Sequence, residues 1–502
     1  MPRRLVIRTT LDRAGIEAAR RPRHQPVLES RAGDGVFDAV EGPVWSYRRT
    51  VTVTPADDGG GQVAETVDFQ LAVPYFAWLV RKPFESAMRR PDTARPWWMP
   101  PARLDARASA MLGTVAAIAI VFGYLNTLFT QTIAFAGEEF GAGNGAQGLA
   151  GSVVRLGGLI ALGLLALADR RGRRAVLLAA VAGGCVFSAT GALTPSLPWL
   201  AATQVFARGC AVAVLVVASI ITVEEMPAGS RAWAISLLAM AAGFGAGVCV
   251  ASLRLADLGE QGWRLLYVLP LAALPVVRSV GRRLPESRRF ERPHAEVRVR
   301  GHGTRLWLLG ASGFLSNLFV APNAQFNNRF LRDERQYSGG AIALLSLGAG
   351  TPGVIGIVAG GRLADVRGRR IVAAVSLTFG TLCNVAFYFA GGWGLWLWAV
   401  LGAILVDAQI PALAVYGPEL FPTSLRGRAN GIITITSLAG SAVGLAAAGA
   451  LADHFGRIGP ALALLALGPL LLAALVVVAY PETAGLELET INPEDAGPPS
   501  VL

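Results

Sequence analysis

Charged residues and cysteines are scarce in this sequence. Only 16% of its 502 residues are charged, whereas a typical soluble domain has about 25%, and 53% are hydrophobic. The four cysteines form no C-x-x-C pair, so neither a disulfide framework nor a zinc site is expected. The sequence also has no Walker-type phosphate-binding loop, no metal-ligand spacing and no nucleophile with a base in a recognisable motif. These absences argue against an enzyme, an ATP-driven pump, a metal protein and any other cofactor-binding protein.

Long apolar runs fill the chain beyond residue 109. A helix needs about 20 apolar residues to cross a bilayer core. Twelve runs reach about this length, at residues 110–136, 148–168, 175–194, 197–222, 232–253, 263–280, 305–326, 339–361, 371–391, 393–417, 428–450 and 457–480. We therefore expect an all-α membrane protein with twelve transmembrane helices in a lipid bilayer.

The basic residues are unevenly distributed along the chain. The net charge of +11 could suggest a nucleic-acid partner, but the arginines concentrate in the even-numbered connections between the predicted helices, and Lys82 is the only lysine. This is the positive-inside pattern, which places those connections and both termini in the cytoplasm. The charge therefore predicts a multi-pass protein of the cell membrane, in particular of a bacterial inner membrane, and no nucleic-acid partner.

Three charged motifs occur twice, at an offset of 195 or 196 residues. The duplicated residues of two motifs are Asp169, Gly172, Arg173, Arg174, Glu224 and Arg231 in the first half, and Asp365, Gly368, Arg369, Arg370, Glu419 and Arg426 in the second. The third motif is Pro285-Glu286-Ser287, repeated as Pro481-Glu482-Thr483. The duplication predicts two six-helix halves in parallel orientation, at residues 110–280 and 305–480, with a basic linker at 281–304 and a cytoplasmic tail at 481–502.

The motifs resemble those of the major facilitator superfamily over residues 105–490, and most of all its sugar-porter and related metabolite-porter branches. The resemblance is carried by GGRLADVRGRR at 360–370, PELFPTSLRGRANG at 418–431, PESRRF at 285–290, PETAGLELE at 481–489 and GWR at 262–264. It implies the major facilitator fold and a monomeric secondary transporter, such as a symporter, that works by alternating access. It also implies that the duplicated clusters latch the two halves when the transporter faces outward. The alternative is that the arginines only set the topology.

The aspartates of the duplicated loop lie at predicted helix ends beside arginines. Asp169 and Asp365 can accept charge-assisted hydrogen bonds from guanidinium groups, or can complement the positive N-terminal end of a neighbouring helix. The family's loop has a glycine four residues before this aspartate. That residue is Gly361 in the second half but Leu165 in the first. We therefore expect the second span to pack more loosely, or in a different shape, in the first half.

Polar residues present in one half only are the candidates for substrate binding and proton coupling, because duplicated motifs belong to the shared framework. Asp407 and Arg155 are predicted within spans, where a charge costs at least ~2.5 kcal/mol. Asp407 would couple protons, contact substrate or form a structural ion pair, and Arg155 would bind a carboxylate or neutralise Asp407. The other candidates are Asn126, Gln131, Arg208, Asn317, Asn323, Gln325 and Gln409.

The expected function is the secondary transport of a small polar metabolite, an anion if Arg155 faces the cavity, coupled to protons. Sugar porters commonly carry an aspartate after Gly-Tyr in the first span, but Leu125 follows Gly123-Tyr124 here, and the Gln-Gln pair of their seventh span is also missing. Two alternatives remain open. One is a drug or natural-product exporter of the same fold, and the other is a membrane ligand sensor that signals through the N-terminal module.

Residues 1–109 are expected to form a cytoplasmic N-terminal extension. Within residues 36–100, alternating side chains at 45–55 and 63–73 predict a β-hairpin. A basic amphipathic helix with an aromatic face is predicted at 75–90, interrupted at Pro83. Residues 1–35 are rich in arginine and lack periodicity, so we expect them to be disordered.

Overall fold

The computed structural model describes residues 3–55, 60–90, 98–142, 144–287, 302–337, 339–422 and 424–495. These residues belong to two compact units, Met1–Val115 and Ala116–Leu502, which we call unit 1 and unit 2. Unit 1 contains a β-sheet and the start of the first long helix. Unit 2 is helical throughout its regular structure, as far as its described residues extend.

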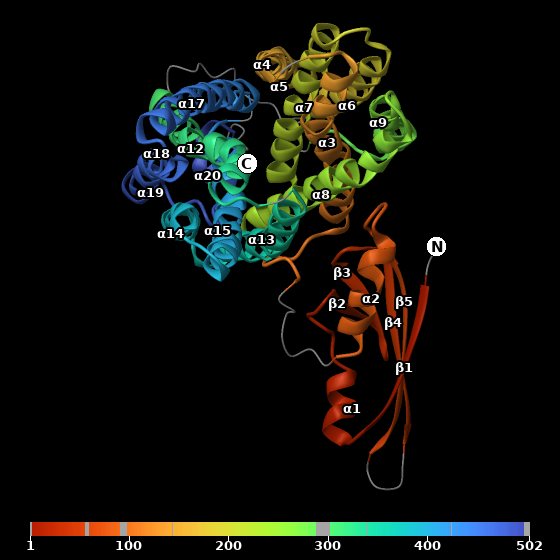
Figure 1. Cartoon of the computed structure of the whole chain (residues 1–502). Coiled ribbons are helices and arrows are strands. Elements are labelled where there is room, and N and C mark those ends of the chain that lie inside the picture. The colour runs from red at the N-terminus through yellow and green to blue at the C-terminus, as the bar shows by residue number, and fades with distance from the viewer. Residues whose placement is uncertain are drawn as a thin grey trace. The chain divides into compact units, whose positions relative to one another are not determined.

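Unit 1 contains a five-stranded sheet with the strand order β1-β5-β4-β3-β2 (Figure 1). Its elements are β1 (Arg3–Leu11), α1 (Arg13–Ala19), β2 (Leu28–Gly33), β3 (Val36–Glu41), β4 (Val44–Pro55), β5 (Gly61–Leu71) and α2 (Ala77–Met88). The expected hairpin is present as β4 and β5, which pair in antiparallel register. α2 is continuous and contains Pro83, which lies on its exposed side. Water can therefore replace the hydrogen bond that the proline removes, and the helix is not interrupted there.

The expected disorder of residues 1–35 is wrong. β1 pairs with β5 along its whole length, and β2 pairs with β3. Between them, α1 begins where Asp12 Oδ1 accepts a hydrogen bond from the backbone N–H of Gly15 at 2.8 Å. Two arginines of this segment pair with residues far along the chain, Arg4 with Asp68 at 2.8 Å and Arg23 with Glu65 at 2.5 Å. Such partners are a matter of tertiary contact, so local composition does not reveal them.

The interior of unit 1 combines an apolar core with a buried ion network. Phe84 of α2 packs on Phe69 of the sheet, with the ring centroids 5.0 Å apart. The guanidinium of Arg49 is 0% exposed and pairs with Glu29 at 2.7 Å and with Glu65 at 3.1 Å. Because each of these charges has an opposite charge beside it, the cost of its burial is offset.

Unit 2 continues α3 (Ala106–Glu139) and contains all the later helices (Figure 1). The longer ones are α4 (Asn144–Arg155), α5 (Gly158–Arg171), α6 (Arg173–Thr190), α7 (Leu197–Glu225), α8 (Arg231–Ser252), α10 (Leu274–Arg283), α12 (Gly303–Arg329), α13 (Gly339–Arg367), α14 (Arg369–Phe389), α15 (Trp393–Ala414), α17 (Arg426–Phe455) and α19 (Leu467–Ala479). Short helices are α9 (Gly262–Val268), α16 (Tyr416–Glu419), α18 (Ile458–Leu465) and α20 (Leu488–Ile491).

Nine helical segments of the described residues are long and apolar enough to cross a membrane. They are Ala106–Ile133, Arg173–Leu193, Leu197–Glu225, Ala228–Ser252, Gly262–Arg283, Arg369–Phe389, Trp393–Glu419, Arg428–Ala452 and Ile458–Ala479. Of the twelve predicted runs, the second, seventh and eighth are not among them. The second is divided into α4 and α5, of 12 and 14 residues, and the other two correspond to α12 and α13.

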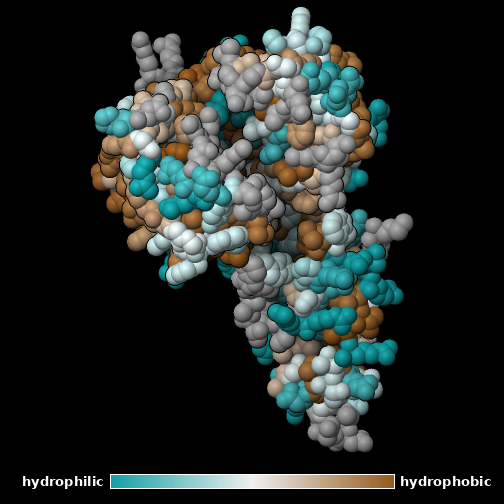
Figure 2. Space-filling model, viewed as in Figure 1, coloured by the Kyte–Doolittle hydropathy of each residue, from teal (hydrophilic) through white to brown (hydrophobic). Residues whose placement is uncertain are grey.

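The surface of unit 2 is hydrophobic where its outer helices lie. Figure 2 shows hydrophobic surface at the left of the view, over α18 and α19 of Figure 1. Leu464, Leu467, Leu471 and Val478 of these helices are all about half exposed or more, with exposed fractions of 47%, 53%, 59% and 83%. A surface of this kind suits the hydrocarbon of a bilayer.

The same close helix contact occurs in both halves of unit 2. Gly245 of α8 lies over the backbone of Ile120 in α3, where an added Cβ would be 1.9 Å from the Ile120 oxygen. Gly440 of α17 lies over Phe314 of α12, where a Cβ would be 2.3 Å from the Phe314 oxygen. A glycine is needed at both positions because the two backbones approach too closely for any side chain.

Candidate functional site

The duplicated motifs gather at one end of unit 2, which we call the motif end. Their first group, cluster A, joins Asp169, Arg173 and Glu224 of the first half to Arg426 of the second. Arg173 Nη2 lies 3.3 Å from Asp169 Oδ1 and 3.7 Å from Glu224 Oε1. Arg426 Nη1 lies 2.7 Å from the same Glu224 oxygen. Glu224 therefore bridges two buried guanidinium groups that belong to different halves.

Cluster B is the equivalent group with the halves exchanged. Arg369 Nη2 lies 3.2 Å from Asp365 Oδ1, and Arg369 Nη1 pairs with Glu419. Arg231 Nη1, from the first half, lies 3.1 Å from Glu419 Oε1. All four side chains are 0% exposed. Each half therefore contributes an Asp-Arg-Glu set and receives one arginine from the other half.

The two aspartates also contact the first turn of a helix from the opposite half. Asp169 Oδ2 accepts a hydrogen bond from the backbone N–H of Arg428 in α17 at 2.9 Å. Asp365 accepts hydrogen bonds from the N–H groups of Ala232 and Trp233 in α8 at 3.3 and 3.0 Å. A carboxylate at a helix N-terminus is stabilised by the free N–H groups and by the helix dipole. In both halves, the aspartate thus lies at the N-terminal end of a neighbouring helix, which is one of the two contacts that the sequence suggested.

The turn between α5 and α6 and the turn between α13 and α14 each need a glycine. Gly172 and Gly368 have φ angles of 99° and 103°, in the region that side chains disfavour. The arginines beside them, the exposed Arg174 and the half-buried Arg370, donate to backbone carbonyl groups at the ends of α10 and α19. These two arginines therefore contact their own half rather than the opposite one.

Two carboxylates of the third motif were not among the predicted gate residues. Glu286 accepts hydrogen bonds from the backbone N–H groups of Arg173 and Arg174, at 2.9 and 3.2 Å, where α6 begins. Glu482 does the same where α14 begins, at 3.0 and 3.2 Å. The common offset of the three motifs was the sequence signal that could have linked these glutamates to the loop arginines.

The departure at Leu165 changes the shape of one contact between the halves. In the second half, Gly361 of α13 packs on α8, and a Cβ there would be 2.8 Å from the backbone oxygen of Ala232. In the first half, Leu165 is 0% exposed, and the small residue is Gly431 on the facing helix α17. A Cβ at Gly431 would be 2.6 Å from Leu162 Cδ2 and 3.6 Å from Leu165 Cδ1. The packing is therefore close in both halves, with the glycine moved to the partner helix.

At the far end of unit 2, the ion pairs of the described residues stay within one half. Glu139, at the end of α3, pairs with Arg264 at 2.7 Å and accepts a hydrogen bond from the indole N–H of Trp263 at 2.6 Å. In the second half, Glu334 accepts a hydrogen bond from the backbone N–H of Ile458 at 2.7 Å. In the first half, a carboxylate at the end of α3 thus contacts the start of α9. In the second half, a carboxylate just beyond α12 contacts the start of α18.

The predicted polar candidates fall into two groups, one in each half. In the first half, Arg208 Nη1 of α7 donates to the backbone oxygen of Asn126 at 3.3 Å and to its side-chain oxygen. Gly157 packs against Arg208, where a Cβ would be 3.0 Å from Arg208 Cβ. Arg155 lies two residues before Gly157, is exposed, and its charge repels that of Arg208. Neither arginine forms an ion pair with an acidic residue in the described part of the chain.

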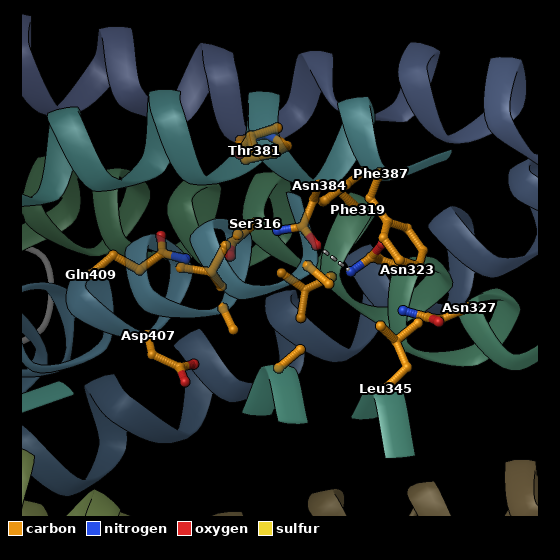
Figure 3. A pocket seen from close by; sticks show the side chains of 17 residues that line it. Ser316, Phe319, Asn323, Asn327, Leu345, Thr381, Asn384, Phe387, Asp407 and Gln409 are labelled. Carbon is orange, nitrogen blue, oxygen red and sulfur yellow. Dashed lines mark hydrogen bonds between the residues drawn. The ribbon is translucent and has the colours of Figure 1, made fainter. Parts of the chain in front are cut away.

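In the second half, a cavity of about 300 Å³ lies among α12, α13, α14 and α15 (Figure 3). Asn323, Asp407 and Gln409 line it, together with Asn384 of α14. Asn323 Nδ2 donates to Asn384 Oδ1 at 3.3 Å, the bond that is dashed in Figure 3. Gln409 is 8% exposed, and its side-chain oxygen has no hydrogen-bond partner among the described residues. The cavity therefore offers polar groups to a small polar ligand or to water.

Asp407 lies apart from these amide groups in Figure 3. Its carboxylate lies over Gly353 of α13, where a Cβ would be 2.2 Å from Oδ2, so a side chain at that position would require the carboxylate to move. No hydrogen bond or ion pair joins this carboxylate to another residue of the described segments. The alternative in which Arg155 neutralises Asp407 is therefore not realised in this structure.

The remaining candidates lie outside both groups. Asn317 donates to the backbone of its own helix at 3.0 Å and accepts a hydrogen bond from Ser441 of α17 at 3.2 Å, which is a contact between helices. Gln131 lies in α3 and is half-buried. The side chain of Gln325 lies outside the described residues. Within the described segments, no group of His, Cys, Asp and Glu side chains could hold a metal ion.

Comparison with known proteins agrees with the helical architecture. Residues 306–499 match the model of the Major Facilitator Superfamily. This match covers the C-terminal part of the chain, which is therefore similar to the superfamily. The match indicates a membrane transporter rather than an enzyme.

Several solved transporter structures share the fold. The proton:xylose symporter XylE bound to 6-bromo-6-deoxy-D-glucose is 17% identical, with a TM-score of 0.65 over 77% of this chain and 98% of that chain. The human organic anion transporter MFSD10 is 16% identical, with a TM-score of 0.59 over 73% and 98%. The transporter FucP in the outward conformation is 14% identical, with a TM-score of 0.62 over 75% and 100%. No curated protein sequence matches the chain significantly.

Proposed function

We propose that this transporter has twelve spans in two six-helix repeats, works by alternating access, and faces outward in this structure. The observation that carries the proposal is the difference between the two ends of unit 2. Clusters A and B join the halves at the motif end, whereas the ion pairs of the far end stay within one half. The motif end is cytoplasmic because its connections are rich in arginine. Both termini then lie in the cytoplasm, beneath a cell membrane such as a bacterial inner membrane.

Clusters A and B are the cytoplasmic gate. Desolvation offsets much of the Coulomb attraction in a buried ion pair, so such pairs contribute little net stability. Their charges can therefore exchange protein partners for water when the cytoplasmic end opens. The two halves then rock against each other around a site between them. The likeness to a structure of FucP in the outward conformation supports the assigned state.

The transported substrate is a small polar metabolite that carries negative charge. Arg155 and Arg208 place two positive charges near each other, with Asn126 beside them and no acidic partner. Charges within membrane helices are kept when they have a partner or a function. A carboxylate or phosphate group of the substrate would supply the missing negative charge, and arginine can bind either group through two parallel hydrogen bonds. The likeness to an organic anion transporter supports this reading.

Asp407 is the proton-coupling residue. It is an acidic group within a helix long enough to span the membrane, and it has no cationic partner in the described part of the chain. A carboxyl group in that setting can bind a proton in one conformation and release it in the other. Structural relatives include the proton:xylose symporter, so the fold is compatible with proton coupling. Asn323 and Gln409 line the adjoining cavity and can hold water or substrate beside Asp407.

The function is tested with the purified chain in two steps. A thermal-shift screen compares organic acids with neutral sugars on the wild type, Arg155→Ala and the charge-preserving control Arg155→Lys. A ligand at about 100 times its dissociation constant adds about 2.7 kcal/mol of apparent stability. Acids should stabilise the wild type and Arg155→Lys but not Arg155→Ala. If neutral sugars stabilise all three proteins equally, the substrate is not an anion.

The coupling is then tested in proteoliposomes with a ligand found by the screen. An imposed pH gradient should drive its accumulation by the wild type. Asp407→Asn should abolish this accumulation and keep exchange between equal concentrations on the two sides, because exchange needs no net proton movement. Retained pH-driven accumulation in Asp407→Asn would remove this residue from the coupling role.

A further inference from the structure

The side of α2 that faces away from the sheet begins with large apolar residues. Phe84 and Met88 point into the core of unit 1 and are 2% and 0% exposed, which fixes the rotation of the helix. At its start, Trp78 is 71% exposed and Leu79 is 57% exposed. Two large apolar side chains next to each other, both more exposed than buried, are unusual on a domain surface and call for an apolar environment.

Basic residues follow these apolar ones along the same surface. Lys82, Arg89 and Arg90 are all exposed. Lys82 follows Trp78 at helical spacing, so the two lie on the same side of α2. The segment has one carboxylate, Glu85, which pairs with Arg81 at 3.7 Å. The exposed surface of α2 is therefore apolar at its start. Basic side chains follow at Lys82 and, just past the end of the helix, at Arg89 and Arg90.

Unit 1 itself places the start of α2 close to the first membrane span. Gly113 of α3 packs against the chain just before α2: a Cβ there would be 3.1 Å from the backbone oxygen of Pro74 and 3.4 Å from Val73 Cγ1. All three residues belong to unit 1. Gly113 also belongs to the candidate span Ala106–Ile133. The segment that leads into α2 is thus attached to a helix that enters the bilayer.

The depth of this contact corresponds to the membrane interface. Gly113 lies about 9 Å along α3 from Arg107, the last charged residue before the apolar run. The interfacial layer on each side of the hydrocarbon core is about 5–8 Å thick. Trp78 follows Pro74 by four residues, so it lies within about 14 Å of that contact. Trp78 can therefore reach the boundary between headgroups and acyl chains.

We propose that α2 is an interfacial helix that binds an anionic lipid surface beside α3. Trp78 and Leu79 insert at the level of the upper acyl chains. Lys82, Arg89 and Arg90 contact the phosphate groups of anionic lipids. Tryptophan and leucine on one part of a helix and basic residues on the rest are typical of helices that lie in the membrane plane. Each basic residue near an anionic leaflet adds to the attraction. The contact would hold unit 1 on the membrane independently of the transport cycle.

The proposal is tested with spin labels on the full-length chain in liposomes. Leu79→Cys carries the label at the proposed contact, and Thr54→Cys carries it at the opposite end of β4 as a matched control. Both positions are exposed, and the four native cysteines are buried. The strand β4 separates Thr54 from the end of the sheet near α2 by roughly 33 Å. The accessibility of each label to oxygen, which partitions into lipid, is compared with that to a water-soluble nickel chelate.

In liposomes that contain phosphatidylglycerol, the ratio of oxygen to nickel accessibility should be several-fold higher at 79 than at 54. The difference should shrink in pure phosphatidylcholine and in the triple variant Lys82→Glu, Arg89→Glu and Arg90→Glu. Equal, water-like ratios at both positions would overturn the proposal. So would a label at 79 that neither reagent reaches, because the helix would then be covered by protein. An equal depth in charged and neutral membranes would overturn the recognition of anionic lipid.

Discussion

The two ends of unit 2 use similar ion pairs for different purposes. At the proposed cytoplasmic end, Glu224 and Glu419 each bridge guanidinium groups from both halves. At the proposed outer end, Glu139 connects only elements of the first half, and Glu334 only elements of the second. The ion pairs that join the two halves and the ion pairs that connect helices within one half thus lie at opposite ends of unit 2. A transporter can then break the first set of contacts while it keeps the second.

The two contacts between the halves also show how a repeat can diverge without losing its packing. Gly361 supplies the small residue in one contact, and Gly431 supplies it from the facing helix in the other. Leu165 fills the space that the first half would otherwise leave. A close helix contact needs one small residue at the crossing, and either helix can provide it.

The largest effect is expected from Glu419→Gln. It removes the carboxylate that pairs with Arg231 and Arg369, both 0% exposed, and a broken buried pair costs about 3–5 kcal/mol. The cytoplasmic end should open, and uptake should fall by roughly a hundredfold or more. Distances between spin labels on the cytoplasmic ends of α5 and α17 measure the opening.

The matched control is Glu139→Gln at the outer end. It should lower the melting temperature, because Arg264 loses its partner, and it should leave the distance between α5 and α17 unchanged. If both variants open the cytoplasmic end to the same extent, the assigned difference between the two ends is wrong.

A smaller effect is expected from Asp365→Asn. The amide keeps the shape of the side chain but loses the charge that faces Arg369 and the N-terminus of α8. Hydrogen bonds to charged groups contribute about 1.5–3 kcal/mol, so exchange should slow by about tenfold or more. Substrate affinity should be preserved, because Asp365 lies in the gate. Exchange rates and binding isotherms separate the two quantities, and Asp169→Asn should behave alike. Normal exchange in both variants would exclude the gating role of the aspartates.

The glycine positions should differ in their sensitivity. Gly361→Ala meets a backbone oxygen and should weaken the closed cytoplasmic end by about 1–3 kcal/mol. Gly431→Ala meets the end of the Leu162 side chain, which can rotate, so its effect should be smaller.

The double variant Leu165→Gly, Gly431→Ser imitates the contact of the other half. It should have a higher melting temperature than Leu165→Gly alone, and the reverse order would show that the two contacts are not equivalent.

The smallest effect is expected from Arg174→Ala. Its exposed side chain donates to a backbone carbonyl of its own half, and exposed interactions of this kind contribute about 1 kcal/mol or less. Uptake should stay within about twofold of the wild type. Arg173→Ala, one residue earlier, should lower uptake by about tenfold, less than Glu419→Gln, because it removes a buried member of cluster A. Similar losses in both variants would mean that any arginine of this loop serves the gate equally.

The sequence allowed much of the framework to be predicted, because its signals are local or repeated. Apolar runs identified the helices, and alternation identified β4 and β5. The offset between motifs indicated the clusters of Asp169 and Asp365, and the departure at Leu165 was visible as a difference between the repeats. Each of these features depends on backbone geometry or on duplicated residue types, which a linear pattern records.

The sequence by itself thus determined the apolar helices, the family resemblance and the duplicated motif residues. Only the tertiary structure decided which charges meet: that Glu224 reaches Arg426, that Glu419 reaches Arg231, and that Asp407 has no partner among the described residues. It also decided that β1 and β2 are ordered, because their partners lie elsewhere in the sheet. The physical reason is that a helix or a strand follows from neighbours along the chain, whereas an ion pair or a strand pairing follows from distances that only the folded chain establishes.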